Sequence, residues 1–248
     1  LIPSEWVQLS VNAHEILGIT PSGVRKAGLD VADEGKDLNA LCGRHGVLVE
    51  YLESWSGKGS DTYATAKKAY DMCLVLGYNL VDFDADGIGA YLRGDARVLN
   101  EGKKTKIDFE GFRGSGEVVD PEDDPLHKPG MPKDPKKSRT KEDFFANRKA
   151  QAWSSLRRRF QITYRAVTAK RKNECYDFSP EDIISISSAI DELPKLLTEL
   201  SQPTYLINGA GKILVDKMPD GARSPNLADA VMIAFAPPKK RLRGILDA

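Results

Sequence analysis

Three aspartates stand where the pattern of core residues does not call for a charge. Asp30 ends the apolar run in VRKAGLD, Asp84 directly follows YNLVDF, and Asp229 lies inside the apolar segment SPNLADAVMIAF. No cation stands one helical turn from Asp229, and a half-buried carboxylate without a partner is costly. Clustered carboxylates repel each other unless a hard cation lies among them, and Mg²⁺ prefers oxygen ligands. Asp30, Asp84 and Asp229 are therefore candidate metal ligands.

Two divalent ions held about 4 Å apart activate water and stabilise the leaving oxygen in phosphodiester hydrolysis. A metal-dependent nuclease is thus one interpretation of the three aspartates. The other is structural, because an acidic residue at a strand end is commonly a cap or turn residue. Lys217, eight residues before Pro225, is a candidate contact for a scissile phosphate, with a solvated lysine as its alternative interpretation.

Apolar periodicity and turn residues predict the elements that must position these side chains. The last helix is expected to have Ser224 as its N-cap and Pro225 at its first position. The predicted elements are a helix at 3–17, three strands within 24–55 with a tight turn at 44–46, a helix at 61–76, a strand at 78–83, a helix at 89–100, a strand at 104–112, a long helix at 141–168, a helix beginning at 179–180, a hairpin at 203–217 and the last helix at 224–235.

This order of elements predicts an α/β fold in which helices cover a mixed sheet. The hydrophobic fraction of 41% is sufficient for a core, and the formal net charge of zero predicts no polyanion partner. Cys42, Cys73 and Cys175 form no CxxC pair, which argues against a zinc site and favours a reducing, cytoplasmic setting. No apolar run approaches the roughly 20 residues of a membrane span, and no signal peptide is recognisable, so we expect no membrane partner. The first residue, Leu1, suggests a fragment of a longer chain.

Three segments resemble, in order, the signature segments of the nuclease domains of tailed-bacteriophage large terminase subunits: GLDVADEGKDLNAL, VDFDADGIGAYL and SPNLADAVMIAFAP. The resemblance implies an RNase H-like fold and a metal-dependent endonuclease that cuts concatemeric double-stranded viral DNA during genome packaging. Its acidic residues, carried over by position, are Asp30, Asp84 and Asp229. In that class Asp30 would bridge two Mg²⁺ or Mn²⁺ ions, and Asp84 and Asp229 would each complete one site. Asn226 stands where the family often has aspartate, so no metal role is expected there.

The same resemblance implies a domain organisation and partners. The opening IPSEWV is similar to the stretch that follows the ATPase domain in this family, so residues 1–22 would be a linker segment and 23–248 the nuclease domain. The implied partners are double-stranded DNA, an upstream ATPase domain of the same polypeptide, the portal protein and the small terminase subunit, in the host cytoplasm. Residues 114–140 are rich in Pro, Gly and charge and predict a mobile loop, and 237–248 form a basic tail.

Local charge offers a route to DNA despite the neutral total. The acidic residues concentrate at 117–124, which leaves other surfaces positive and predicts weak, sequence-independent contact with phosphates. The basic clusters are 133–141, 157–159, 170–172 and 239–243.

Other interpretations of the motifs are weaker or remain open. DFDADG is not an EF-hand loop, because its twelfth position is Arg93, and no Thr or Ser follows it as an aspartate-dependent phosphatase requires. GKGS lacks the spacing of a phosphate loop. Two alternatives stay open: a junction resolvase or transposase-type nuclease of the same class, and a non-catalytic module that docks DNA or a portal ring.

Overall fold

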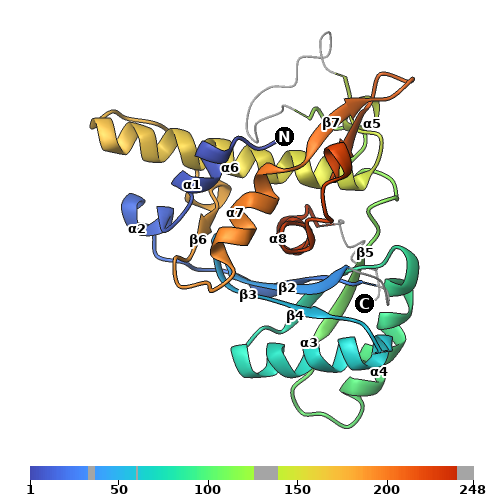
Figure 1. Cartoon of the computed structure of the whole chain (residues 1–248). Helices are drawn as coiled ribbons and strands as arrows, with labels where there is room; N and C mark the ends of the chain where they lie inside the picture. The colour runs from blue at the N-terminus through green and yellow to red at the C-terminus, as the bar shows by residue number, and fades with distance from the viewer. Residues whose placement is uncertain (33–36, 60, 126–138, 239–248) are drawn as a thin grey trace, which may run out of the picture.

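A six-stranded mixed sheet with helices on both faces forms the centre of the protein (Figure 1). The computed structural model describes residues 1–32, 37–59, 61–125 and 139–238. The sheet order is β5-β4-β1-β2-β3-β6, and β7 and β8 form a separate hairpin. The strands are β1 (Arg25–Asp30), β2 (Leu38–His45), β3 (Leu48–Ser56), β4 (Leu80–Asp84), β5 (Asp108–Phe112), β6 (Ser185–Ile186), β7 (Thr204–Ile207) and β8 (Ile213–Asp216). The helices are α1 (Ser4–Leu9), α2 (Ala13–Leu17), α3 (Thr62–Leu76), α4 (Leu92–Asn100), α5 (Lys141–Phe144), α6 (Arg148–Lys172), α7 (Leu193–Ser201) and α8 (Asn226–Phe235).

The central strand β1 determines where the acidic residues meet. It pairs antiparallel with β2 and parallel with β4, with Leu29 opposite Phe83. Because the carboxyl ends of parallel strands lie at the same edge of a sheet, the last residues of β1 and β4 are neighbours. Those last residues are Asp30 and Asp84.

Helix α8 packs very closely on the sheet. A Cβ atom at Gly28 would lie 2.3 Å from the carbonyl oxygen of Ala230 and 2.5 Å from the amide nitrogen of Ala234, so only glycine permits this approach. Helices α6, α7 and α8 share one apolar core with this face of the sheet, and α3 and α4 share a second core with the other face (Figure 1). The close contact brings Asp229 of α8 toward the end of β1.

Several predicted elements differ from the structure for identifiable reasons. The helix expected at 3–17 is divided into α1 and α2, because Asn12 between them has a positive φ of 50°. The long helix expected at 141–168 begins later, at an Asn147 cap that accepts from the amide of Ala150, and runs on to Lys172. The helix expected from Ser179 is wrong, since only the 3-10 turn Pro180–Asp182 forms there. The β-branched run that follows is buried and pairs with β3 as β6, and α7 comes later.

The start of α8 also differs from expectation. Its N-cap is Pro225 rather than Ser224, and no side chain of the cap residue accepts a hydrogen bond. Instead, Oε2 of Glu199 on α7 accepts from the amides of Leu227, at 2.7 Å, and Ala228, at 3.2 Å. A carboxylate from another helix therefore satisfies the free amides of this helix start.

The loop and tail predictions are only partly covered by the described residues. Val119, in the expected mobile loop at 114–140, is fixed by Gln151, which accepts from its amide at 2.7 Å and donates to its carbonyl at 2.8 Å. Residues 126–138 of that loop and 239–248 of the basic tail lie outside the described residues. Of the helices that are described, none has the length and apolar character needed to cross a membrane.

Candidate active site

Asp30 and Asp84 lie side by side at one edge of the sheet. Asp30 is buried and Asp84 is half-buried. Oδ1 of Asp84 accepts from the amide of Asp86 at 2.9 Å, which fixes this carboxylate at the turn after β4. A Cβ atom at Gly89 would lie 1.8 Å from the carbonyl oxygen of Asp84, so the turn requires glycine there. The tight turn therefore holds Asp84 at the end of β4.

Asp229 reaches the same edge from α8, and Lys217 is bonded to it. Its side chain is 2% exposed, and its Oδ2 atom accepts from Nζ of Lys217. Its Oδ1 atom is buried and has no hydrogen-bond partner. Lys217 directly follows β8, and its backbone is held by Gln202, whose Nε2 donates to the Lys217 carbonyl at 2.6 Å. The solvated-lysine interpretation of Lys217 is therefore wrong, because its side chain is largely buried against Asp229.

The carboxylates interact strongly enough to change their proton affinities. Burial raises the pKa of Asp30 well above its usual value, Asp229 and Asp84 raise it further, and Lys217 and Lys149 oppose the change. Burial also raises the pKa of Asp84, although the hydrogen bond from the Asp86 amide and the charge of Lys149 each lower it. Burial by itself would lower the pKa of Lys217. The negative charges of Asp229 and Asp30 outweigh the effect of burial, so the pKa of Lys217 is raised. The structure thus brings together all four residues singled out in the sequence.

The arrangement fits a hard cation, although it is not closed around one. Within the described part of the chain, no three or more His, Cys, Asp or Glu side chains are grouped tightly enough to hold a metal ion as they stand. The donors are nevertheless carboxylate oxygens, which Mg²⁺ and Mn²⁺ prefer. The orphaned Oδ1 of Asp229 is a buried acceptor that lacks the compensation such an atom normally has. Lys217 provides a positive charge at the position where a cation would offset the carboxylates.

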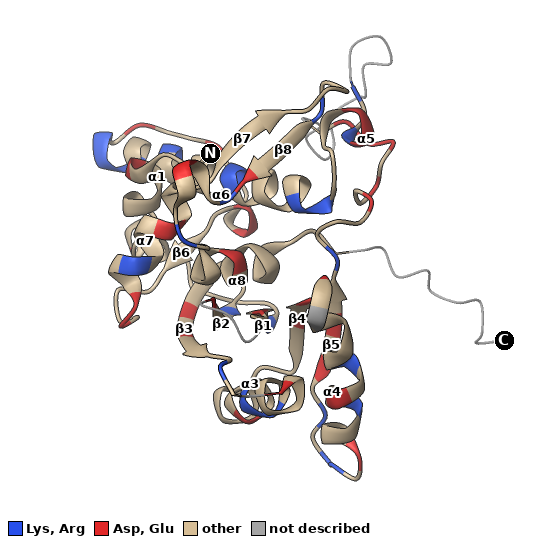
Figure 2. Ribbon diagram, turned by 45° about the vertical axis from the view of Figure 1, so that its right-hand side comes forward, with Lys and Arg blue, Asp and Glu red and all other residues tan. Residues whose placement is uncertain are grey.

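Two further residues at this edge were not predicted as site residues. Asp86 holds the loop after β5, with Oδ2 accepting from the Ser115 amide at 3.0 Å and Oδ1 from the Ser115 hydroxyl at 2.8 Å. Lys149 near the start of α6 lies close enough to lower the pKa of both Asp30 and Asp84. Asp86 stands two residues after Asp84, so its neighbourhood in the sequence could have indicated it, whereas Lys149 is far away in sequence and no local pattern indicates it. Figure 2 shows α8 lying over β1 and β2, with β4 next to β1. We call the place where Asp30, Asp84 and Asp229 meet the acidic edge.

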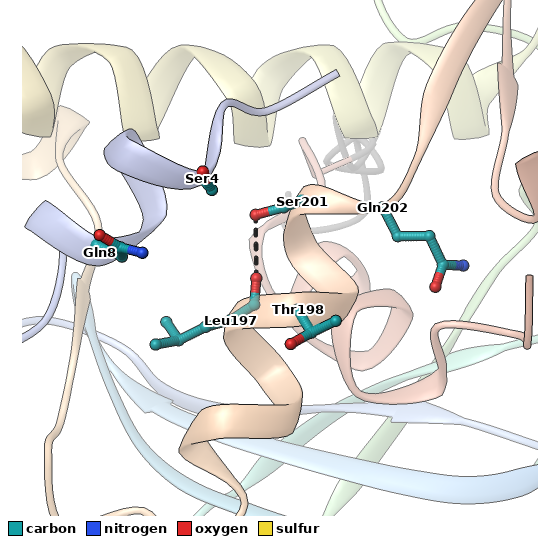
Figure 3. Close-up of a pocket in the computed structure, with 6 residues that line it drawn as sticks. All are labelled: Ser4, Gln8, Leu197, Thr198, Ser201 and Gln202. Atoms are coloured by element: carbon teal, nitrogen blue, oxygen red, sulfur yellow. Dashed lines mark hydrogen bonds between the residues drawn. The ribbon is translucent and has the colours of Figure 1, made fainter.

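The described pocket between α1 and α7 belongs to a different surface (Figure 3). The Ser201 hydroxyl that faces it donates to the carbonyl of Leu197 at 3.0 Å, within α7 itself. None of the aspartates discussed above lines this pocket, so it is not part of the acidic site. Its lining residues are Ser4, Gln8, Leu197, Thr198, Ser201 and Gln202.

Comparison with known proteins identifies close structural relatives. No protein-family model and no curated protein sequence matches the chain. The nuclease domain of the large terminase subunit gp2 of bacterial virus Sf6 superposes with a TM-score of 0.80 at 32% identity, covering 96% of this chain and 98% of that chain. A lysine-to-alanine mutant of that domain, solved with manganese and β-thujaplicinol, gives the same score, identity and coverage. A mutant solved with calcium gives a TM-score of 0.79 at 31% identity, covering 96% and 99% of the two chains.

These relatives superpose on 96% of the chain, and together with its mixed sheet between helices they confirm the RNase H-like fold expected from the sequence. At this identity and coverage the similarity establishes the family as well as the fold. The chain belongs to the nuclease domains of the large terminase subunits of bacterial viruses.

Proposed function

We propose that this domain is a metal-dependent endonuclease that cuts concatemeric double-stranded viral DNA during genome packaging. The observation that carries the proposal is the convergence of Asp30, Asp84 and Asp229 at one edge of the sheet, with an unpartnered Oδ1 on Asp229. Relatives of this family have been solved with manganese and with calcium, which supports a divalent-ion site here.

We assign the ligands from the family resemblance and from how the carboxylates interact. The resemblance to this family implies that Asp30 would be shared between two Mg²⁺ or Mn²⁺ ions, and the effects of Asp229 and Asp84 on the pKa of Asp30 support their proximity. Asp84 and Asp229 would each hold one of the two ions. When bound, such ions supply a nucleophile from water at neutral pH and stabilise charge on the leaving oxygen. Asn226 has no part in this assignment.

Lys217 has two successive roles in this proposal. Without divalent ions it neutralises Asp229, which would otherwise be a buried, unpaired charge. With ions held by the carboxylates, Asp229 would no longer need Lys217 as its counter-charge, and the ammonium would be available to hold the scissile phosphate as a point charge. Such a change of partner would require only a rotation of the Lys217 side chain, because Gln202 holds the backbone of this residue.

The basic clusters contribute to DNA binding less uniformly than their sequence suggests. Nε of Arg157 donates to the Leu1 carbonyl at 3.0 Å, and Arg159 donates to the carbonyls of Glu181 and Ile183 at 2.7 and 3.1 Å. These two arginines therefore join elements of the fold and are not free phosphate ligands. Lys170–Lys172 end α6 on an exposed surface and remain available. The lysines of 133–138 and the cluster 239–243 lie outside the described residues.

The wider setting follows from the family. We propose that an ATPase domain precedes residues 1–22 in the same polypeptide, that the portal protein and the small terminase subunit are partners, and that the host cytoplasm is the location. The four candidate residues are carboxylates and a lysine, which bind metal ions and phosphates rather than base edges, so we expect cleavage with little sequence preference.

The test is nicking and linearisation of supercoiled plasmid with Mg²⁺, Mn²⁺ or EDTA. We expect cleavage that requires the metal and is lost in Asp30→Asn. Asp71→Asn is the matched control, because Asp71 is an exposed residue of α3 paired with Lys67 on the other side of the sheet. A folded wild-type protein that cleaves with neither ion would contradict the proposal and favour a docking module. A strong preference for branched over linear DNA would instead favour a resolvase.

A further inference from the structure

Lys149 extends from the start of α6 toward the acidic edge. Its amide donates to the carbonyl of Gly114 at 2.8 Å, which ties this helical turn to the loop after β5. Its side chain then passes through the space that Gly114 leaves open. A Cβ atom at Gly114 would lie 2.7 Å from Cε of Lys149 and 3.3 Å from Oδ2 of Asp86. A glycine is therefore needed at position 114 for Lys149 and Asp86 to approach each other.

A continuous set of hydrogen bonds fixes this placement. Asp84 accepts from the amide of Asp86, Asp86 accepts from Ser115, and the carbonyl of Gly116 accepts from the amide of Arg148 at 2.9 Å. The end of β4 is thereby connected to the first turn of α6. Lys149 is presented to the site by backbone contacts rather than by a mobile surface segment.

The charge of Lys149 affects the carboxylates of the site although Lys149 is not bonded to them. Lys149 lowers the pKa of both Asp30 and Asp84, so it lies within electrostatic range of both carboxylates. Among the described residues, however, its ammonium makes neither an ion pair nor a side-chain hydrogen bond, whereas that of Lys217 is bonded to Asp229. A lysine that only balanced the carboxylates would bond to one of them. A half-buried ammonium that stops short of the carboxylates can instead receive an anion that enters from solvent.

We propose that Lys149 is a phosphate-binding residue of this site, which contacts the backbone of the DNA strand that lies over Asp84. The inference rests on the proposed nuclease function and adds a second lysine, besides Lys217, to the proposed site. The two lysines come from neighbouring elements, because the amide of Ala146, just before α6, donates to the carbonyl of Ile213 in β8 at 2.9 Å. Together they would offer two positive charges to a DNA strand that reaches Asp30 and Asp84.

The test measures how binding to a linear duplex depends on salt, in EDTA so that no cleavage occurs. One lost phosphate contact should lower the slope of log K against log salt concentration by about 0.9 and weaken binding roughly 3- to 10-fold at moderate salt. We expect this change for Lys149→Ala and near wild-type binding for Lys149→Arg, which keeps the charge. Lys67→Ala, on the opposite side of the sheet, should change neither quantity.

Gly114→Ala provides a second variant in which no charge is removed. The added Cβ displaces the Lys149 side chain, so binding should weaken while Lys149 itself is retained. An unchanged salt slope in folded Lys149→Ala would overturn the inference. A wild-type protein that binds DNA but never cleaves it would overturn the proposed nuclease function. In that case the slope of log K against log salt concentration would still show whether Lys149 contacts a phosphate. With active wild type, Lys149→Ala should raise KM more than it lowers kcat.

Discussion

Nζ of Lys217 is bonded to Oδ2 of Asp229, and the two residues come from a hairpin and a helix that are separate in the fold. The side chain of Asp229 is 2% exposed and that of Lys217 is 22% exposed. In this pair the positive charge of Lys217 compensates the buried negative charge of Asp229.

Removing this lysine should make stability depend on divalent ions. Lys217→Ala leaves Asp229 buried and unpaired, which we expect to lower the free energy of unfolding by about 2–3 kcal/mol in EDTA. Saturating Mn²⁺ should restore much of this loss, because the ion replaces the missing cation. Thermal melts with and without Mn²⁺ measure both effects. Lys67→Ala, which breaks the exposed 2.5 Å pair with Asp71 on α3, is the control and should leave the free energy of unfolding nearly unchanged. An equal response to Mn²⁺ in wild type and Lys217→Ala would contradict this account.

Asp30→Asn should stabilise the metal-free fold at neutral pH. The raised pKa means that the folded state holds the Asp30 proton more tightly than the unfolded chain, so the ionised form destabilises the fold. The penalty is complete above the raised pKa and vanishes as the pH falls to the unfolded value of about 3.9. We expect the variant to be more stable by about 1–2 kcal/mol at pH 7, a few degrees in Tm.

Melts in EDTA between pH 4 and 8 check this prediction. The advantage of Asp30→Asn over wild type should shrink toward pH 4, and Mn²⁺ should raise the Tm of the wild type much more than that of the variant. Asp71→Asn, at an exposed position, should show no such pH dependence. An advantage that is constant over the whole range would mean that ionisation of Asp30 is not its cause.

Gly28→Ala should separate Asp229 from Asp30. The new methyl group would overlap the backbone of α8 at Ala230 and Ala234, so the helix must move away from β1. We expect a loss of about 3 kcal/mol in stability and a larger proportional loss of metal-dependent cleavage. Gly94→Ala is the control, because a Cβ there meets open space within α4 and should be neutral or stabilise by up to about 1 kcal/mol. Full activity in Gly28→Ala would show that the close packing of α8 is dispensable.

Glu199→Ala should loosen the start of α8. Two buried amides, those of Leu227 and Ala228, lose their acceptor, at an expected cost of about 1–3 kcal/mol. Glu199→Gln keeps a carbonyl acceptor and should lose less. Hydrogen exchange at these two amides tests the prediction directly, and protection that survives in Glu199→Ala would count against it.

Much of the fold and the acidic edge could be predicted from local sequence. The strand ends at Asp30 and Asp84, the hairpin that carries Lys217 and the apolar helix around Asp229 follow from periodicity and turn residues, and the structure places them together. What local pattern could not reveal depends on contacts between distant segments. Lys217 was a candidate phosphate contact, but its ion pair with Asp229 was not predicted, and neither was the capping of α8 by Glu199 of α7. A search one helical turn from each residue finds neither.

The docking of α8 on β1 also has a consequence for biosynthesis. Asp30 and Asp84 emerge from the ribosome early, whereas Asp229 lies on the last helix of the described chain. A nascent chain that stops before α8 has two of the three acidic groups and an uncovered sheet face, so it has no complete cation site. The proposed cation site can therefore form only after α8 has been translated and has packed against β1.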